Sequence, residues 1–235
     1  MPTGLRASWT RTANGALARL ASWLASLRIG GASHSVWGGS AHRHGRSMRR
    51  GSPRMGSTGS ARDWIGRAQQ AAARGDTQEA CRCYREAGTL VPYNARVWIA
   101  LGRSAAMLHH YDESRRAFER AQDIASGMDA LEATFGIGFS ANGLADYAVA
   151  EAAFQRVLPA MRDESHPLLA DTLYGLAFAL LRTGRAEDAA RLLEECVLVR
   201  SRFPAAWQLL ALSLWRSRQL WRLWRIIWAA SSKAH

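Results

Sequence analysis

Large apolar residues and small residues follow one another in a fixed order along the middle of the chain, and the order returns after 34 residues. Between residues 95 and 128, Trp98 and Gly102 fall on one face of a predicted first helix. Ser114 and Phe118 fall on one face of a second helix. We find no strict apolar and polar alternation of the kind that predicts a strand. The pattern therefore predicts an all-α protein built from repeated helix pairs.

Copies of the pattern follow one another with few interruptions. They cover residues 61–94, 95–128, 131–164 and 170–203, with a partial copy from residue 204. Helix axes can approach to about 8–10 Å only where a large side chain meets small ones. We expect Phe118 to pack against Gly102, and Phe154 against Gly138. Because a single pair cannot bury its apolar face, neighbouring pairs must stack.

The spacing of Trp98, Leu101 and Gly102, followed by Phe118 and Ala121, resembles the tetratricopeptide repeat (TPR) family. The resemblance implies an all-α, right-handed superhelical solenoid of antiparallel helix pairs. It also implies that the first helices line a concave groove, where partner polypeptides bind. The family's known basic clamp for acidic tails is not expected here, because apolar and amide residues occupy its positions.

The resemblance also places particular side chains in that groove. Carried over by their offsets within the repeats, they are Arg96, Arg103, Phe135, Phe139, Tyr174 and Phe178. Such a groove would suit a protein or peptide with apolar anchors and acidic residues. The alternative is that the phenylalanines serve ordinary packing between helices.

A narrower likeness concerns the junction of the first two repeats. The run at residues 91–98, followed by Leu101, Gly102 and Tyr111, is similar to the same junction in type III secretion chaperones. This likeness implies, as an alternative function, a chaperone for hydrophobic translocator segments. It is local, because those proteins usually end after three repeats.

The net charge of +12 is concentrated at the two ends of the chain. Residues 1–60 hold nine arginines and no acidic residue, and their Gly, Ser and Arg content predicts a disordered leader. Within the leader, residues 14–29 predict a short amphipathic helix. Three interpretations remain open: an organelle-import presequence, a basic anchor, or an untranslated segment with the true start at Met48 or Met55.

Residues 214–235 are rich in Trp and Arg and contain no acidic residue. The stretch from Leu214 to Trp228 predicts one amphipathic helix. This helix would either cap the last repeat or lie on an anionic membrane surface. The second possibility gives a rival function, a membrane-peripheral adaptor.

We identify no catalytic, cofactor-binding or metal-binding motif, so the sequence favours a non-enzyme. The cysteines Cys81, Cys83 and Cys196 have no metal-binding spacing and are expected to be reduced, which favours a cytoplasmic protein. Organelle import and membrane association are the alternatives. Nucleic acid is not an expected partner, because the excess basic charge lies outside the repeats. The sequence indicates no oligomeric state.

Overall fold

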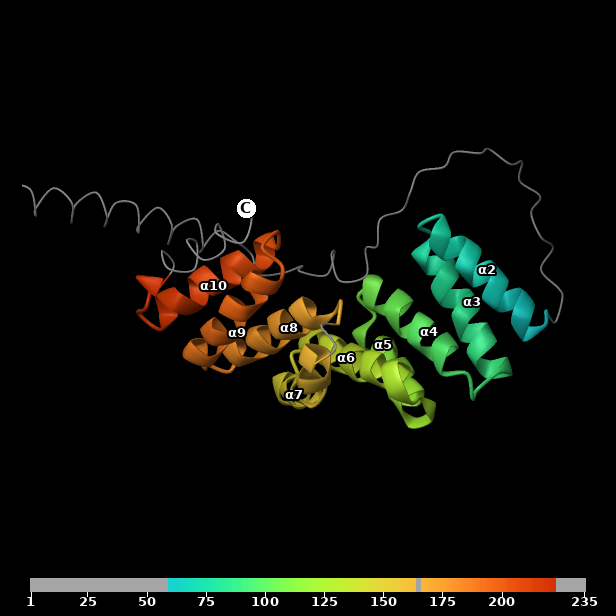
Figure 1. Cartoon of the computed structure of the whole chain (residues 1–235). Helices are drawn as coiled ribbons and strands as arrows, with labels where there is room; N and C mark the ends of the chain where they lie inside the picture. Colours follow the sequence, from blue (N-terminus) through green and yellow to red (C-terminus); the bar gives the residue numbers. More distant parts are fainter. Residues whose placement is uncertain (1–58, 164–165, 223–235) are drawn as a thin grey trace, which may run out of the picture. The chain divides into compact units, whose positions relative to one another are not determined.

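The structure is a computed structural model that describes residues 59–163 and 166–222, all within one compact unit of the chain. The predictions for the leader and for residues beyond 222 therefore lie outside the described residues. In these two ranges the secondary structure is helical (Figure 1). The helices are α2 (Ala61–Ala73), α3 (Thr77–Leu90), α4 (Ala95–Met107), α5 (Tyr111–Ile124), α6 (Gly127–Gly143), α7 (Tyr147–Asp163), α8 (Leu169–Arg182), α9 (Ala186–Val199) and α10 (Pro204–Arg216).

Consecutive helices pack against each other along the whole described range, and α4, α6, α8 and α10 also contact one another in that order. From the second pair onward, the first helix of one pair thus touches the first helix of the next pair. Local signals begin several helices. At the start of α2, Ser60 and Asp63 form a reciprocal capping box. The predicted all-α array of helix pairs is confirmed.

The turn that follows the first helix of each repeat has the same geometry in all five repeats of the described range. One residue adopts a left-handed backbone with φ between 58° and 88°, and the next donates its N–H to a carbonyl five residues back at 2.8–2.9 Å. The left-handed residues are Gly75, His109, Ala145, Gly184 and Arg218. The spacing between these residues exceeds 34 only across residues 129–130 and 165–169, which lie between the predicted repeats.

Glycines on two successive first helices enclose the core residues Phe118 and Phe154. A Cβ added to Gly102 would lie 2.8 Å from the Phe118 ring, and one added to Gly136 would lie 2.5 Å from it. Phe154 is enclosed in the same way by Gly138 and Gly175. The expected interlocking of large and small residues is confirmed, and the second glycine of each slot joins one repeat to the next.

Two helix boundaries differ from what local sequence signals suggest. Proline commonly ends a helix, but α7 continues past Pro159 to Asp163. Pro159 is exposed, whereas Leu158 and Met161 on either side are buried. Packing on these neighbours therefore holds the helix together beyond the hydrogen bond that proline cannot make. In addition, α6 begins at Gly127 rather than at residue 131.

The predicted continuous helix from Leu214 is wrong in its described part. Leu214 is fully buried in α10, which ends at Arg216, and the chain then turns at Arg218. After the turn, Leu220 packs against the core and Arg222 forms an ion pair with Glu194 at 2.7 Å. In the described residues, no helix combines the length and apolar character that a bilayer span needs.

Candidate functional site

The structure buries part of the surface that the repeat pattern assigned to a groove. Phe135 is only 1% exposed and packs edge to face on Phe154, with ring centroids 5.7 Å apart. It therefore belongs to the core and is removed from the candidate site. Ile99 and Leu181, which also stand at positions that face the groove in tetratricopeptide repeats, are buried as well. The physical reason is that Gly136 and Gly138, which follow Phe135 in α6, let neighbouring helices approach closely enough to cover it.

Both predicted arginines already have carboxylate partners. Arg96 forms an ion pair with Asp129 at 3.2 Å, and Arg103 forms one with Glu132. Burial lowers the pKa of Arg103, which indicates that its guanidinium lies in a partly desolvated place. Because each pair joins α4 to α6, these arginines hold successive repeats together. The expectation that they favour an acidic partner is correspondingly weakened.

The other predicted aromatic residues are partly exposed and lie in pairs. Phe139 on α6 packs against Tyr111, with ring centroids 6.4 Å apart, and Phe178 on α8 packs against Tyr147 at 6.2 Å. The Tyr147 hydroxyl also accepts a hydrogen bond from Arg182 at 3.0 Å. We call these two pairs the inner aromatic row: Tyr111, Phe139, Tyr147 and Phe178.

The tyrosines of the row were not among the predicted site residues. Each is the first residue of a second helix, Tyr111 of α5 and Tyr147 of α7. Both stand at the same offset from the start of their repeats, which is a signal that could have identified them. Tyr111 is held in place by close contact with Gly143, where an added Cβ would lie 2.5 Å from its ring.

Tyr174, also predicted for the groove, lies apart from these pairs. It packs against Phe203 with ring centroids 5.1 Å apart, at the junction of the fourth and fifth repeats. Burial raises its pKa to about 12, so the hydroxyl stays protonated at neutral pH. Tyr174 therefore belongs to the packing of this junction more than to an accessible row.

Asn142 lies one turn beyond Phe139 on α6 and has one unsatisfied polar atom. Its side-chain N–H group donates to the carbonyl of Gly175 at 2.9 Å. Its Oδ1, which is shielded from solvent, accepts no hydrogen bond within the described residues. A shielded acceptor without a donor costs about 1–3 kcal/mol of stability.

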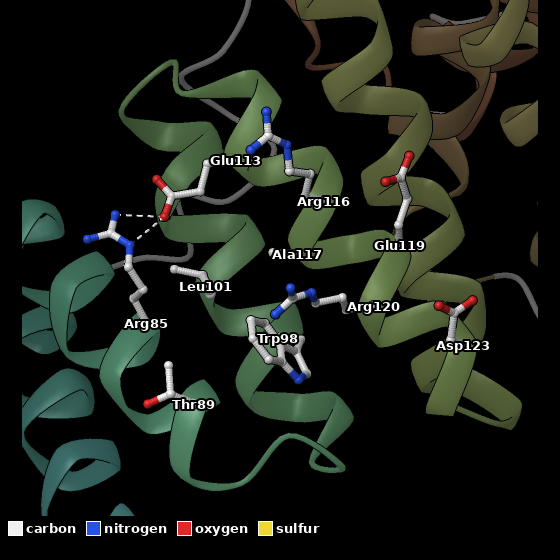
Figure 2. Close-up of a pocket in the computed structure, with 10 residues that line it drawn as sticks. All are labelled: Arg85, Thr89, Trp98, Leu101, Glu113, Arg116, Ala117, Glu119, Arg120 and Asp123. Carbon is white, nitrogen blue, oxygen red and sulfur yellow. Dashed lines mark hydrogen bonds and ion pairs between the residues drawn. The ribbon is translucent and has the colours of Figure 1, made fainter.

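A pocket of about 470 Å³ lies elsewhere, between α3, α4 and α5 (Figure 2). Its charged residues counter one another: Arg85 forms an ion pair with Glu113 at 2.6 Å, and Arg120 lies over the Trp98 ring at 4.8 Å. With arginines and carboxylates mixed along its walls, the pocket does not select a ligand of one charge. The lining residues are Arg85, Thr89, Trp98, Leu101, Glu113, Arg116, Ala117, Glu119, Arg120 and Asp123.

The cysteines are poorly suited to nucleophilic or metal chemistry. All three are free and buried. Burial raises the pKa of Cys83 to about 11 and that of Cys196 to about 12, so the thiolate form is scarce at neutral pH. Among the residues that the structure describes, no cluster of His, Cys, Asp and Glu could hold a metal ion.

The junction motif that resembles secretion chaperones has a packing role. The Trp98 indole N–H donates to the carbonyl of Pro92 at 2.8 Å. The same contact recurs between Trp207 and Ser201 at 2.8 Å, in the junction before the fifth repeat. The tryptophan of this motif therefore stabilises the junction between successive repeats.

Comparisons with known proteins agree with this architecture. Family models described as tetratricopeptide repeat match residues 61–104 and 129–198. A crystal structure of MamA protein has a TM-score of 0.60 at 17% identity, covering 74% of this chain and 91% of that one. MamA from Desulfovibrio magneticus RS-1 gives 0.61 at 17%, covering 74% and 97%. TPR-like repeats from Podosopora anserina give 0.58 at 16%, covering 73% and 93%.

No protein of curated function matches the chain in sequence. At these identities the solved structures show a common fold and nothing more. The family matches, however, fall on α2 to α4 and on α6 to α9, where the turn geometry and the phenylalanine slots recur. The chain therefore belongs to the tetratricopeptide repeat family.

Proposed function

We propose that this protein–protein interaction scaffold holds a segment of a partner polypeptide along the inner aromatic row. The TPR scaffold family is generally non-enzymatic, and we propose the same for this chain. The observation that carries the proposal is the partial exposure of Phe139 and Phe178, which lie on the first helices of successive repeats and each pack against a tyrosine. An apolar side chain of the partner would contact each of these two phenylalanine rings.

The chemistry of the row suits apolar anchors more than acidic ones. Phe139 and Phe178 are partly exposed, and each is braced by a tyrosine, so little side-chain entropy is lost on binding. The two arginines predicted for the groove, Arg96 and Arg103, are already paired with carboxylates. We therefore propose a partner segment with two apolar side chains, with acidic residues of secondary importance.

The proposal can be tested with peptides selected from a random display library on the full chain. The selected peptides should share apolar anchor positions. Affinity for Phe139→Ala and for Phe178→Ala should fall by about 1–2 kcal/mol, roughly 5- to 30-fold, in a titration by fluorescence anisotropy.

Tyr93→Ala provides the matched control. Tyr93 is also aromatic, but it is 88% exposed and lies in the connection between the first two repeats. Its loss should leave peptide affinity unchanged. Selected peptides that bind wild type, Phe139→Ala and Phe178→Ala equally would place the binding surface elsewhere.

A further inference from the structure

The end of the described repeat array presents two tryptophans to solvent in fixed positions. Trp215, in the last turn of α10, is 49% exposed, and Trp221, after the following turn, is 67% exposed. The position of Trp221 is set by its neighbours. Leu220 packs inward against the core, and Arg222 pairs with Glu194 at 2.7 Å. Trp221, between them, is therefore directed outward.

The same turn carries two arginines without carboxylate partners. Arg216 and Arg218 are exposed, and within residues 59–163 and 166–222 neither forms an ion pair. No acidic residue follows Glu195 in the sequence. By contrast, many arginines of the repeats are paired, as Arg162 is with Glu195 at 2.6 Å. The turn is thus a locally uncompensated positive surface.

Exposed tryptophan next to unpaired arginine matches the chemistry of an anionic membrane surface. The indole ring is apolar with one polar N–H, and it prefers the boundary between hydrocarbon and headgroups. Each arginine near such a surface gains about 1 kcal/mol from the negative potential of the lipids. A protein partner would need acidic groups to pair with these arginines. An anionic bilayer supplies phosphate groups for the arginines and a hydrocarbon layer into which the tryptophan rings can insert.

We propose that this Trp-Arg turn (Trp215, Arg216, Arg218 and Trp221) binds the surface of an anionic lipid bilayer. The contact rests on a turn whose geometry repeats that of the other helix pairs, so the array itself provides the rigid support. It replaces the continuous amphipathic helix that the sequence predicted. It is also independent of the inner aromatic row, and a scaffold held in this way could bind its partner at the membrane.

The experiment is flotation of the full chain with vesicles of phosphatidylcholine alone or mixed equally with phosphatidylserine. All proteins carry Leu20→Ser and Leu24→Ser, which remove the apolar face of the leader's amphipathic segment. The parent should bind only the phosphatidylserine vesicles. Trp215→Ala with Trp221→Ala should lower the partition coefficient about tenfold or more. Arg216→Gln with Arg218→Asn should lower it about 30-fold, and asparagine tolerates the left-handed backbone at position 218.

Matched controls distinguish the effect of the Trp-Arg turn from the effect of removing any exposed aromatic residue or any exposed arginine. Tyr93→Ala removes another exposed aromatic residue and Arg156→Gln another exposed arginine, and both should bind like the parent. Circular dichroism melts should show that every variant keeps its fold. Binding should weaken as NaCl rises from about 0.1 M to about 0.5 M, because salt screens exposed charges.

Several results would overturn the proposal. They are absence of binding by the parent, equal binding by parent and turn variants, or equal binding to both kinds of vesicle. A single-stranded oligonucleotide that binds the parent and not the turn variants, in the absence of vesicle binding, would assign the surface to nucleic acid. Peptide binding by the inner aromatic row should be unchanged in the turn variants, so failure here leaves the proposed function intact.

Discussion

Phe118 fits between α4 and α6 because both helices carry glycine at the point of contact. Replacing Gly136 by alanine would place a Cβ 2.5 Å from a ring that is fully buried and cannot move aside. We expect Gly136→Ala to lower the free energy of unfolding by about 1–3 kcal/mol in urea titrations. Helix propensity alone would change it by about 1 kcal/mol in the opposite direction.

Gly66 in α2 is the control for this effect. It is also a helical glycine, but no heavy atom lies within 4 Å of its added Cβ. Gly66→Ala should therefore raise stability by up to about 1 kcal/mol. The two substitutions should change the free energy of unfolding in opposite directions. Equal changes would mean that the helices are loosely packed around Phe118.

Ala145 shows the cost of a turn without glycine. Its φ of 61° is left-handed, which costs an alanine about 1–2 kcal/mol. Ala145→Gly relieves this strain but makes the unfolded chain more flexible, so we expect a net gain of about 0.5–1 kcal/mol in thermal or urea unfolding. Ala152→Gly, in the exposed interior of α7, should instead lose about 1 kcal/mol. A loss of stability at both positions would contradict a left-handed backbone at Ala145.

The turns also show the limit of sequence interpretation at the level of single residues. A glycine at a helix end commonly makes the turn, yet Gly143 is the last residue of α6 and Ala145 makes the turn. Gly143 is glycine because the Tyr111 ring lies against it. A glycine required for close packing and one required for a turn look alike in sequence, and only the contact between repeats distinguishes them.

At the scale of elements, one buried carboxylate joins α8 to the C-terminal end of α9. Asp171 is almost fully buried and receives hydrogen bonds from Arg200 at 2.9 and 3.0 Å. Burial raises the pKa of Asp171 even though Arg200 opposes the shift. A pKa raised in the folded state means that the folded protein binds the proton more tightly. The contribution of Asp171 to stability is therefore present at low pH and lost as pH rises through its folded pKa.

Asp171→Asn removes this dependence because asparagine carries no charge at any pH. We expect the stability of the variant relative to wild type to increase between about pH 3.5 and pH 6.5 in urea unfolding, since only wild type must ionise a buried group. Glu187→Gln on the exposed surface of α9 is the control and should show no such trend. A relative stability that falls as pH rises would mean that the Arg200 pair outweighs desolvation.

The helix pairs themselves could be predicted because their signal lies within single repeats. Trp98, Gly102 and Phe118 report on contacts between residues close in the chain. The inner surface could not be predicted as well, because its exposure depends on how far neighbouring repeats approach. Phe135 is buried by such an approach, whereas Phe139, four residues later, stays partly exposed. Offsets within a repeat do not contain that information.

At the scale of the molecule, the buried apolar residues of the described range form two clusters that meet in α6 and α7. One cluster extends from α2 through α6 to Ala153 in α7 and includes Phe118, and the other extends from α6 to α10 and includes Leu193. In a repeat array, stability is approximately a sum of each repeat and its contacts with its neighbours. Damage to one cluster should therefore loosen that end of the array before the other.

Hydrogen exchange followed by mass spectrometry can test this division. Phe118→Ala should cost about 3–5 kcal/mol locally and accelerate exchange in α2 to α5 far more than in α8 to α10. Leu193→Ala, which removes another fully buried side chain, should have the reverse effect. The pair serves as its own control, since both are large-to-small core substitutions. Equal acceleration at both ends by either variant would mean that the array unfolds as one unit, and that the glycine slots in α6 couple the two clusters more tightly than neighbour contacts alone.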